Sequence, residues 1–281
     1  MGVRKLGDRI SFRWIAALTG AFAATAAAAA DLPTTKAPPA PAPAPVVASV
    51  LSGFFVKAGF LYAINSSSSK LYAEPLPGMP EQRLVGVGAN ISNVATVGFV
   101  AGYYVMPSVS IEIQAGVPMW ATNKTKGAPG APFLLPSPPF PPGYSVPPNG
   151  TLLGKFMPSF IPITANYHFT QFGAFQPYVG AGFAPVFAFR TKDEFETNNH
   201  VDPTVGLVLQ GGADIMIDQH WGWTFDVTKL FAEGEAKSTG VNLAQLGPPY
   251  SFASPTKVPT SATQKTRFEP WILATGLTYR F

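Results

Sequence analysis

The closing stretch of the chain, from Thr266 to Phe281 (TRFEPWILATGLTYRF), constrains the fold most. From Glu269 onward, one set of alternate positions is mainly apolar and ends in aromatic residues, whereas the other set is small or polar. This period of two is typical of a β-strand that lies between two different media. A strand of about ten residues with aromatic side chains at its ends fits a membrane better than a soluble sandwich. The stretch therefore predicts an outer-membrane β-barrel that this strand closes.

The N-terminal segment has the form of a secretory signal peptide. Basic residues at positions 4, 5, 9 and 13 precede an apolar run from Trp14 to about Ala24, and Ala28 to Ala30 supply the small residues of a cleavage site. An uncleaved anchor helix is disfavoured because the apolar run is short for a span. We expect residues 1–30 to be the signal peptide, 31–52 a Pro/Ala-rich periplasmic tether, and 53–281 the barrel.

Composition also favours a membrane protein over a nucleic-acid-binding one. Charged residues are only 12% of the chain, against about a quarter in soluble proteins. The net charge of +4 falls to about +1 without the leader, so the basicity does not indicate nucleic acid as a partner. Cysteine is absent, which leaves neither disulfides nor thiolate ligands. After the leader, no stretch of about eighteen apolar residues is free of Pro and polar breaks, which argues against transmembrane helices.

Eight segments of the mature chain have the alternation of strands, and the breaks between them are alternately long and short. The long breaks begin near residues 65, 123, 191 and 237. This pattern predicts an all-β fold, an eight-stranded antiparallel up-and-down transmembrane β-barrel with its termini and short turns in the periplasm. A soluble lipocalin-like barrel is disfavoured because the outward faces are apolar in strand after strand. The predicted strands span residues 53–63, 95–105, 109–122, 153–169, 175–190, 204–217, 221–236 and 266–281.

If the apolar sets face lipid, the remaining sets line the lumen, and charged residues converge at its periplasmic end. We interpret them as a polar floor that closes the barrel. Because an unpaired buried charge costs several kcal/mol, we expect Lys57 or Arg280 to contact Glu112 or Asp226. The predicted floor comprises Lys57, Glu112, Asn166, His168, Gln176, Asp214, Asp226 and Arg280.

The outer half of the lumen receives apolar residues by the same assignment of faces. Water-filled porins line their channels with polar groups, so an apolar lumen suits a small hydrophobic molecule better than an ion. The same side chains could instead simply fill a narrow barrel, because eight strands enclose little space. The residues alone leave both interpretations open. The predicted apolar lining comprises Leu61, Pro118, Trp120, Phe156, Pro158, Phe160 and Pro162.

The sequence gives little support for catalysis, metal binding or nucleotide binding. The three histidines, His168, His200 and His220, do not assemble with a nucleophile and an acid in any recognisable order. An acidic loop around His200 lacks metal-ligand spacing, so a solvated loop is the simpler interpretation. The glycines near residue 180 lie within a strand and do not form a phosphate loop. We therefore expect no enzyme activity, no cofactor and no metal site.

Several segments together resemble the OmpW family of bacterial outer-membrane proteins. The resemblance implies an eight-stranded barrel in the bacterial outer membrane, in contact with membrane lipid and lipopolysaccharide, with a hydrophobic lumen that admits small hydrophobic compounds. Some members serve as bacteriocin receptors, so the alternative is a structural or surface-interaction barrel with a packed lumen and partner-binding loops. The Pro-rich second loop, residues 123–150, and the tether depart from the family pattern. The matching segments are VKAG (56–59), AGYYVMP (101–107), SIEIQA (110–115), MPSFIPITANYHF (157–169), PYVGAG (177–182), GGADIMIDQHW (211–221) and PWILATGLTYRF (270–281).

Overall fold

The computed structural model describes residues 51–74, 78–127, 147–246 and 260–281, together with the backbone of 134–135, 144–145 and 257–258. The predicted signal peptide and all of the predicted tether except residues 51 and 52 lie outside this part of the chain. Within the described ranges, no helix is long and apolar enough to span a membrane. The helical elements there are two short 3-10 turns, η1 (Thr170–Phe172) and η2 (Leu243–Leu246).

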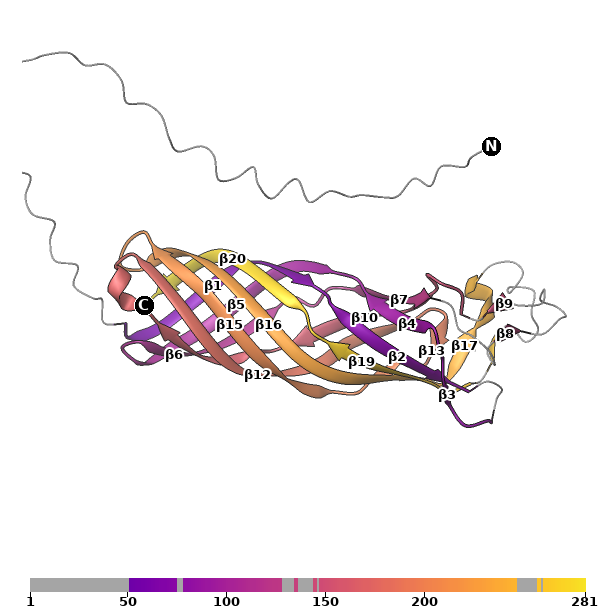
Figure 1. Ribbon diagram of the computed structural model, residues 1–281. Coiled ribbons are helices and arrows are strands. Elements are labelled where there is room, and N and C mark those ends of the chain that lie inside the picture. Colours follow the sequence, from indigo (N-terminus) through magenta and orange to yellow (C-terminus); the bar gives the residue numbers. More distant parts are fainter. Residues whose placement is uncertain are drawn as a thin grey trace, which may run out of the picture. The chain divides into compact units, whose positions relative to one another are not determined.

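Eight strands form a closed antiparallel ring, as the sequence predicts, and Figure 1 shows them wound around a common axis. Each strand pairs with the next in chain order, and the last pairs with the first, where Gly276 lies opposite Gly59. The eight strands close on themselves, so the ladder hydrogen bonds of the span are made within the barrel. The ring strands are β1 (Gly53–Ile64), β5 (Val94–Met106), β6 (Val109–Gly116), β11 (Ile163–His168), β12 (Phe175–Asp193), β15 (Thr204–Met216), β16 (Trp221–Ser238) and β20 (Trp271–Arg280).

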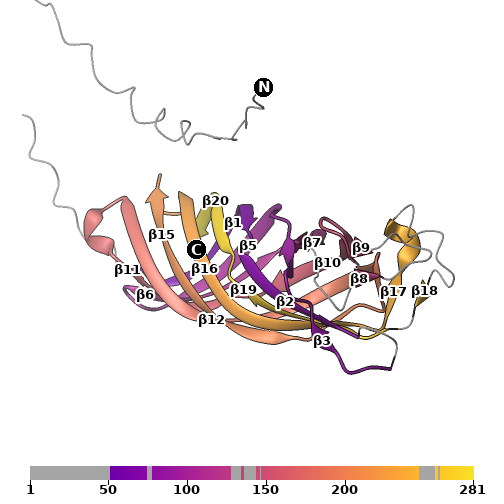
Figure 2. The same cartoon turned by 45° about the vertical axis from the view of Figure 1, so that its right-hand side comes forward.

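The barrel continues as an outer extension beyond the membrane-spanning ring (Figures 1 and 2). β12 and β16 are 19 and 18 residues long, whereas a membrane strand needs about 9 to 11. On one side, β4 pairs with β7, β7 with β10 and β10 with β12; on the other, β3 pairs with β2, β2 with β19 and β19 with β16. The added strands are β2 (Ser67–Ala73), β3 (Gln82–Arg83), β4 (Val87–Ile91), β7 (Ala121–Gly127), β10 (Leu152–Phe160), β14 (His200–Val201) and β19 (Ala262–Phe268).

The extension contains strands where the sequence led us to expect irregular loops. β2 and β4 lie in the passage from residue 65 that we expected to be irregular, and β7 extends into the expected Pro-rich loop. Short pairings also occur between β8 (Leu134–Leu135) and β9 (Tyr144–Ser145), and among β13 (Glu196–Thr197), β17 (Gly240–Asn242) and β18 (Lys257–Val258). These segments escaped the sequence pattern because their outward faces meet water and carry no apolar signal.

The faces of the closing strand are as predicted. Phe281 and Trp271 are exposed on the outside, with 71% of Phe281 accessible, whereas Arg280 is 7% accessible and Thr278 is fully buried. Tyr279 packs against Trp221 of the neighbouring strand, with ring centroids 4.7 Å apart. An arginine on the lipid face at mid-membrane would cost about 2 to 4 kcal/mol. The orientation with Arg280 inside the barrel is therefore also the more stable one.

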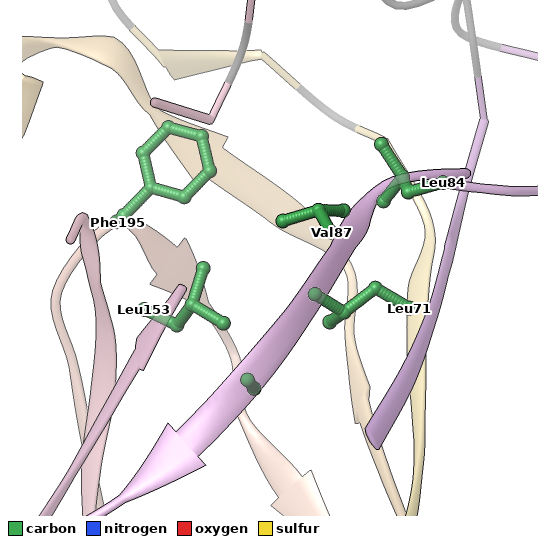
Figure 3. Close-up of a cluster of buried hydrophobic side chains, with 6 residues drawn as sticks. Leu71, Leu84, Val87, Leu153 and Phe195 are labelled. Carbon is green, nitrogen blue, oxygen red and sulfur yellow. The ribbon is translucent and has the colours of Figure 1, made fainter. Parts of the chain in front are cut away.

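Two apolar clusters fill parts of the interior. Ala184, Val208, Leu230 and Ala232 pack together inside the ring, on β12, β15 and β16. A second group, the outer cluster, lies in the extension, where the side chains of separate segments point toward one another (Figure 3). The outer cluster comprises Leu71, Leu84, Val87, Ala89, Leu153 and Phe195. The interior is therefore occupied by apolar packing at two levels above the periplasmic end.

Candidate functional site

The periplasmic end of the lumen holds a network of buried ion pairs. The Lys57 Nζ atom lies 3.5 Å from Oε1 of Glu112 and 3.3 Å from Oδ1 of Asp214. Arg280 Nη2 lies 3.2 Å from Oδ2 of the same Asp214. The expected contact between a base and Glu112 is thus confirmed. Strands β1, β6, β15 and β20 bring the four groups together, and each charge gains the opposite charge that its desolvation requires.

Aromatic and histidine side chains surround these ions. Lys57 Nζ lies 4.2 Å from the ring centroid of Tyr178. His168 Nε2 lies 2.9 Å from the hydroxyl of Ser110 and 3.9 Å from Oε1 of Glu112. Ser110 and Glu112 approach the same ring nitrogen, whereas a catalytic relay needs the acid on the other one. The three residues therefore form part of the closed floor and do not form a nucleophilic triad.

A second polar layer, without a base, is centred on Asp226. Its carboxylate accepts hydrogen bonds from Tyr178 Oη at 2.9 Å, Gln210 Nε2 at 2.7 Å and Thr228 Oγ1 at 2.7 Å. Thr164 Oγ1 in turn donates to Oε1 of Gln210 at 2.7 Å. Asp226 forms no ion pair with Lys57 or Arg280 within the described part of the chain, so its role differs from that of Glu112.

The remaining predicted floor residues, Asn166 and Gln176, are also buried in the lumen. Asn166 Nδ2 donates to the hydroxyl of Thr164 at 3.3 Å, and Gln176 Nε2 donates to the carbonyl of Gly173 at 3.2 Å. All eight residues predicted for the floor are therefore buried together. Sequence reasoning missed Ser110, Thr164 and Gln210, which complete the network; their position in alternation with outward apolar residues was the available signal.

A cavity with about 100 Å³ of free interior volume and an open mouth lies in the outer part of the barrel. β10, β12, β16 and β19 contribute to it, together with the segment that joins β13 to β15. Most of its wall is apolar. The apolar lining comprises Ile91, Phe156, Pro158, Val186, Phe187, Ala188, Val201, Ala232, Ala236 and Phe268.

The residues predicted for an apolar lumen are only partly brought together here. Phe156 and Pro158 line the cavity, and Phe160 packs against the apolar cluster inside the ring. Leu61 lines a smaller space directly above the floor. Pro162 is buried, and Pro118 is partly buried; neither lines the cavity.

Trp120 does not lie in the lumen, where the sequence analysis placed it. It is 44% exposed, as the outward-facing side chains are, and it does not line the cavity. Residues 117–120 leave strand geometry between β6 and β7. The alternation counted from Glu112 is lost across that break, and an extrapolation with a period of two therefore fails.

A polar crossbar spans the cavity from β7 to β19. Asn123 Nδ2 donates to Oε1 of Gln264 at 2.7 Å, and Gln264 Nε2 donates to the hydroxyl of Thr266 at 2.8 Å. Both Asn123 and Gln264 are buried and line the cavity. These two hydrogen bonds reduce the number of polar groups that a bound molecule would have to satisfy.

Two acidic side chains, Glu196 and Asp202, line the outer wall of the cavity. Glu196 carries less negative charge than a free carboxylate, and Asp202 is paired with a base. Burial raises the pKa of Glu196 to about 7. Asp202 accepts a hydrogen bond from Lys237 Nζ at 2.9 Å, which lowers the pKa of that carboxyl. Near neutral pH, Glu196 is protonated for much of the time, and the wall around it is correspondingly closer to neutral.

The wall of the barrel is interrupted on one side. β11 pairs with β6 from Ile163 to Tyr167, and β10 pairs with β7 from Leu152 to Phe156. Between these ladders, the structure shows no strand pairing of residues 117–120 with residues 157–162. This gap contains Pro118, Pro158 and Pro162, which have no N–H to donate. The wall therefore has fewer backbone hydrogen bonds here than along the ladders on either side.

Comparison with known proteins gives a consistent result. Residues 53–281 match the model of the OmpW family. An uncharacterized outer-membrane protein, y4mB, of Sinorhizobium fredii is 31% identical over 275 residues, which cover 98% of each chain. The dibenzothiophene metabolism operon protein PahQ of Pseudomonas aeruginosa is 26% identical over 180 residues, covering 64% of this chain and 74% of that protein.

Solved structures share the fold. The crystal structure of OprG from Pseudomonas aeruginosa aligns with a TM-score of 0.63 at 18% identity, covering 84% of this chain and 99% of OprG. The outer-membrane protein AlkL, solved in lipid bilayers, aligns with a TM-score of 0.51 at 18% identity, covering 90% of this chain and 97% of AlkL. At this identity, the two structures bear on the fold alone.

Proposed function

This chain belongs to the OmpW family of bacterial outer-membrane proteins, and from that membership we propose that its barrel binds small hydrophobic molecules in the outer cavity and passes them passively into the membrane. It is an outer-membrane barrel and not an enzyme. The observation that carries the proposal is an apolar cavity in the outer part of the barrel, above a floor of paired charges. A concave apolar lining with few unpaired polar groups is typical of a site for a small organic molecule.

The lining of the cavity supports an apolar ligand. Phe156, Phe187 and Phe268 offer flat apolar contacts, and the crossbar amides already bond to each other. A polar solute or an ion would find few unpaired groups to replace its hydration. Burial of apolar surface stabilises binding by about 25 cal/mol per Å², so an aromatic hydrocarbon gains most from this wall.

The route out follows from the closed floor. Lys57, Asp214 and Arg280 fill the axis at the periplasmic end, so a hydrophobic molecule cannot continue straight through without breaking ion pairs. The interrupted wall between residues 117–120 and 157–162 offers a sideways path with fewer backbone hydrogen bonds to break. We propose that the solute leaves through this gap into the lipid. The name of PahQ, from a dibenzothiophene metabolism operon, associates one relative with an apolar aromatic compound.

The alternative is a structural or surface-interaction barrel whose lumen is packed solid. The apolar cluster of Ala184, Val208, Leu230 and Ala232 fills one level of the lumen in that manner. The outer cavity is the observation that favours uptake instead, because a barrel used only as a scaffold has no need of an apolar cavity in its interior.

Filling the cavity tests the binding step. Ala188→Trp, on the cavity wall of β12, is expected to weaken the binding of dibenzothiophene by about tenfold or more, because misplaced bulk costs about 1 to 3 kcal/mol. Equilibrium dialysis with the protein in lipid nanodiscs measures this. Ala181→Trp, exposed on the same strand, is the matched control and should bind as the wild type does. Equal affinity for Ala188→Trp and the wild type would refute the assignment of the site.

A further inference from the structure

Four lysines on the outside of the extension form a basic surface that the transport function does not use. We call Lys70, Lys124, Lys126 and Lys265 the lysine belt. All four are exposed, and each alternates along its strand with side chains that are buried or point inward. They therefore face away from the lumen and cannot contribute to the cavity.

The strand register places the belt across neighbouring strands. Lys70 of β2 lies directly opposite Lys265 of β19. Lys126 of β7 lies opposite Gly88 of β4, and a Cβ atom at Gly88 would lie 3.1 Å from the carbonyl oxygen of Ser69 on β2. The belt thus runs from β19 through β2 and β4 to β7. The side chain of Tyr72 lies beside it, with its ring centroid 5.7 Å from Lys265 Nζ.

None of the four lysines of the belt forms an ion pair with a carboxylate of the described residues. The nearby acids have other partners. Glu235 of β16 lies opposite Lys265 but pairs with Lys237 at 3.7 Å, and Glu233 pairs with Arg267. Glu81 accepts hydrogen bonds from the hydroxyls of Ser261 and Thr263. Like charges directly opposite each other destabilise a sheet, so the pairing of Lys70 with Lys265 is a cost that a bound anion would offset.

The distance of the lysine belt from the apolar band of the barrel indicates which anion it meets. Trp271 lies opposite Ile64, and both are exposed at the outer edge of the apolar band. Lys70 and Lys265 each lie six positions beyond that edge, and Lys124 lies four beyond Trp120. With the rise and tilt of membrane strands, this places the belt about 10 to 15 Å outside the hydrocarbon. That depth belongs to the phosphorylated polar layer of the outer leaflet.

We propose that the lysine belt binds the phosphate groups of lipopolysaccharide, the glycolipid of the outer leaflet. Four cationic heads on adjacent strands can contact several phosphates at once, and Tyr72 adds a flat surface beside them. A lysine near a charged membrane surface contributes about 1 kcal/mol, which corresponds to about fivefold in affinity per residue. The expected bound partner is therefore an extended, multiply phosphorylated lipid and not a single phosphate ion.

The test titrates the full-length protein in nanodiscs with purified lipopolysaccharide and with the same lipid after removal of its phosphates. The wild type should prefer the phosphorylated lipid by about 100-fold, and Lys70→Gln/Lys126→Gln/Lys265→Gln should lose most of that preference. Lys192→Gln, at an exposed lysine of β12 that pairs with Glu194, is the control and should retain it.

Three results would overturn the proposal. One is equal affinity of the wild type for the two lipids, which needs no variant and so does not depend on folding. Another is displacement of the lipid by millimolar inorganic phosphate, which would show a site for the free ion. The third is loss of the preference in Lys192→Gln to the same degree as in the triple variant, which would contradict a belt that is specific to the four lysines.

Discussion

Replacing Lys57 with Met is expected to lower the free energy of unfolding of the barrel by about 3 to 5 kcal/mol, the usual cost of removing one partner from a buried ion pair. Lys57 is buried and is the base nearest to Glu112, and it also contacts Asp214. Without it, Glu112 stays in the lumen with no opposing charge, while Asp214 keeps only Arg280. Methionine preserves the apolar length of the side chain, so the loss reports on charge and not on volume.

Urea unfolding of the protein in lipid vesicles measures this difference. Lys237→Met is the matched control, because Lys237 is exposed and pairs with Asp202 at 2.9 Å. An exposed ion pair contributes about 1 kcal/mol or less. If both variants lose the same small amount, the floor is not a network on which the stability of the barrel depends.

Removing both acids of the floor should let ions through. The variant Glu112→Ala/Asp226→Ala deletes one carboxylate from the ion-pair layer and the acceptor of three hydrogen bonds from the layer centred on Asp226. Water can then occupy the space of both side chains around the remaining cations. Planar-bilayer recordings should show conductance steps in the variant where the wild type stays at the level of the lipid alone.

The control for the conductance measurement is Glu233→Ala, which deletes an exposed carboxylate of the extension. It should conduct no more than the wild type. If the double variant also conducts no more than the wild type, the floor is not the barrier to ions, and the passage must be closed at another level, such as the outer cluster.

The barrel wall could be predicted from the sequence because lipid imposes a strong signal. Every lipid-facing position must be apolar, so alternation alone assigns faces, and the inward placement of Lys57, Glu112 and Arg280 follows from it. The choice of partners could not be predicted in the same way. A period of two assigns the face of a residue, whereas its height depends on strand tilt and stagger. We expected Asp226 among the ion pairs, yet Asp214 contacts both bases.

The residues that line the outer cavity were harder to predict from the sequence. Phe156 and Pro158 were predicted, because β10 continues the alternation of β11. Gln264 and Glu196 were not, since β19 and β13 lie beyond the membrane, where outward positions are polar and the contrast between faces disappears. Trp120 was misplaced because the break after Gly116 resets the register. The signal fails where water replaces lipid as the surrounding medium.

Uptake of an apolar aromatic compound into sealed liposomes tests the central proposal most directly. Liposomes that contain the purified protein should take up dibenzothiophene faster than protein-free liposomes of the same lipid, and Ala188→Trp should remove most of that excess while Ala181→Trp retains it. This result is expected if the cavity lies on the path of the solute. A rate of uptake equal to that of protein-free liposomes would contradict the proposed function.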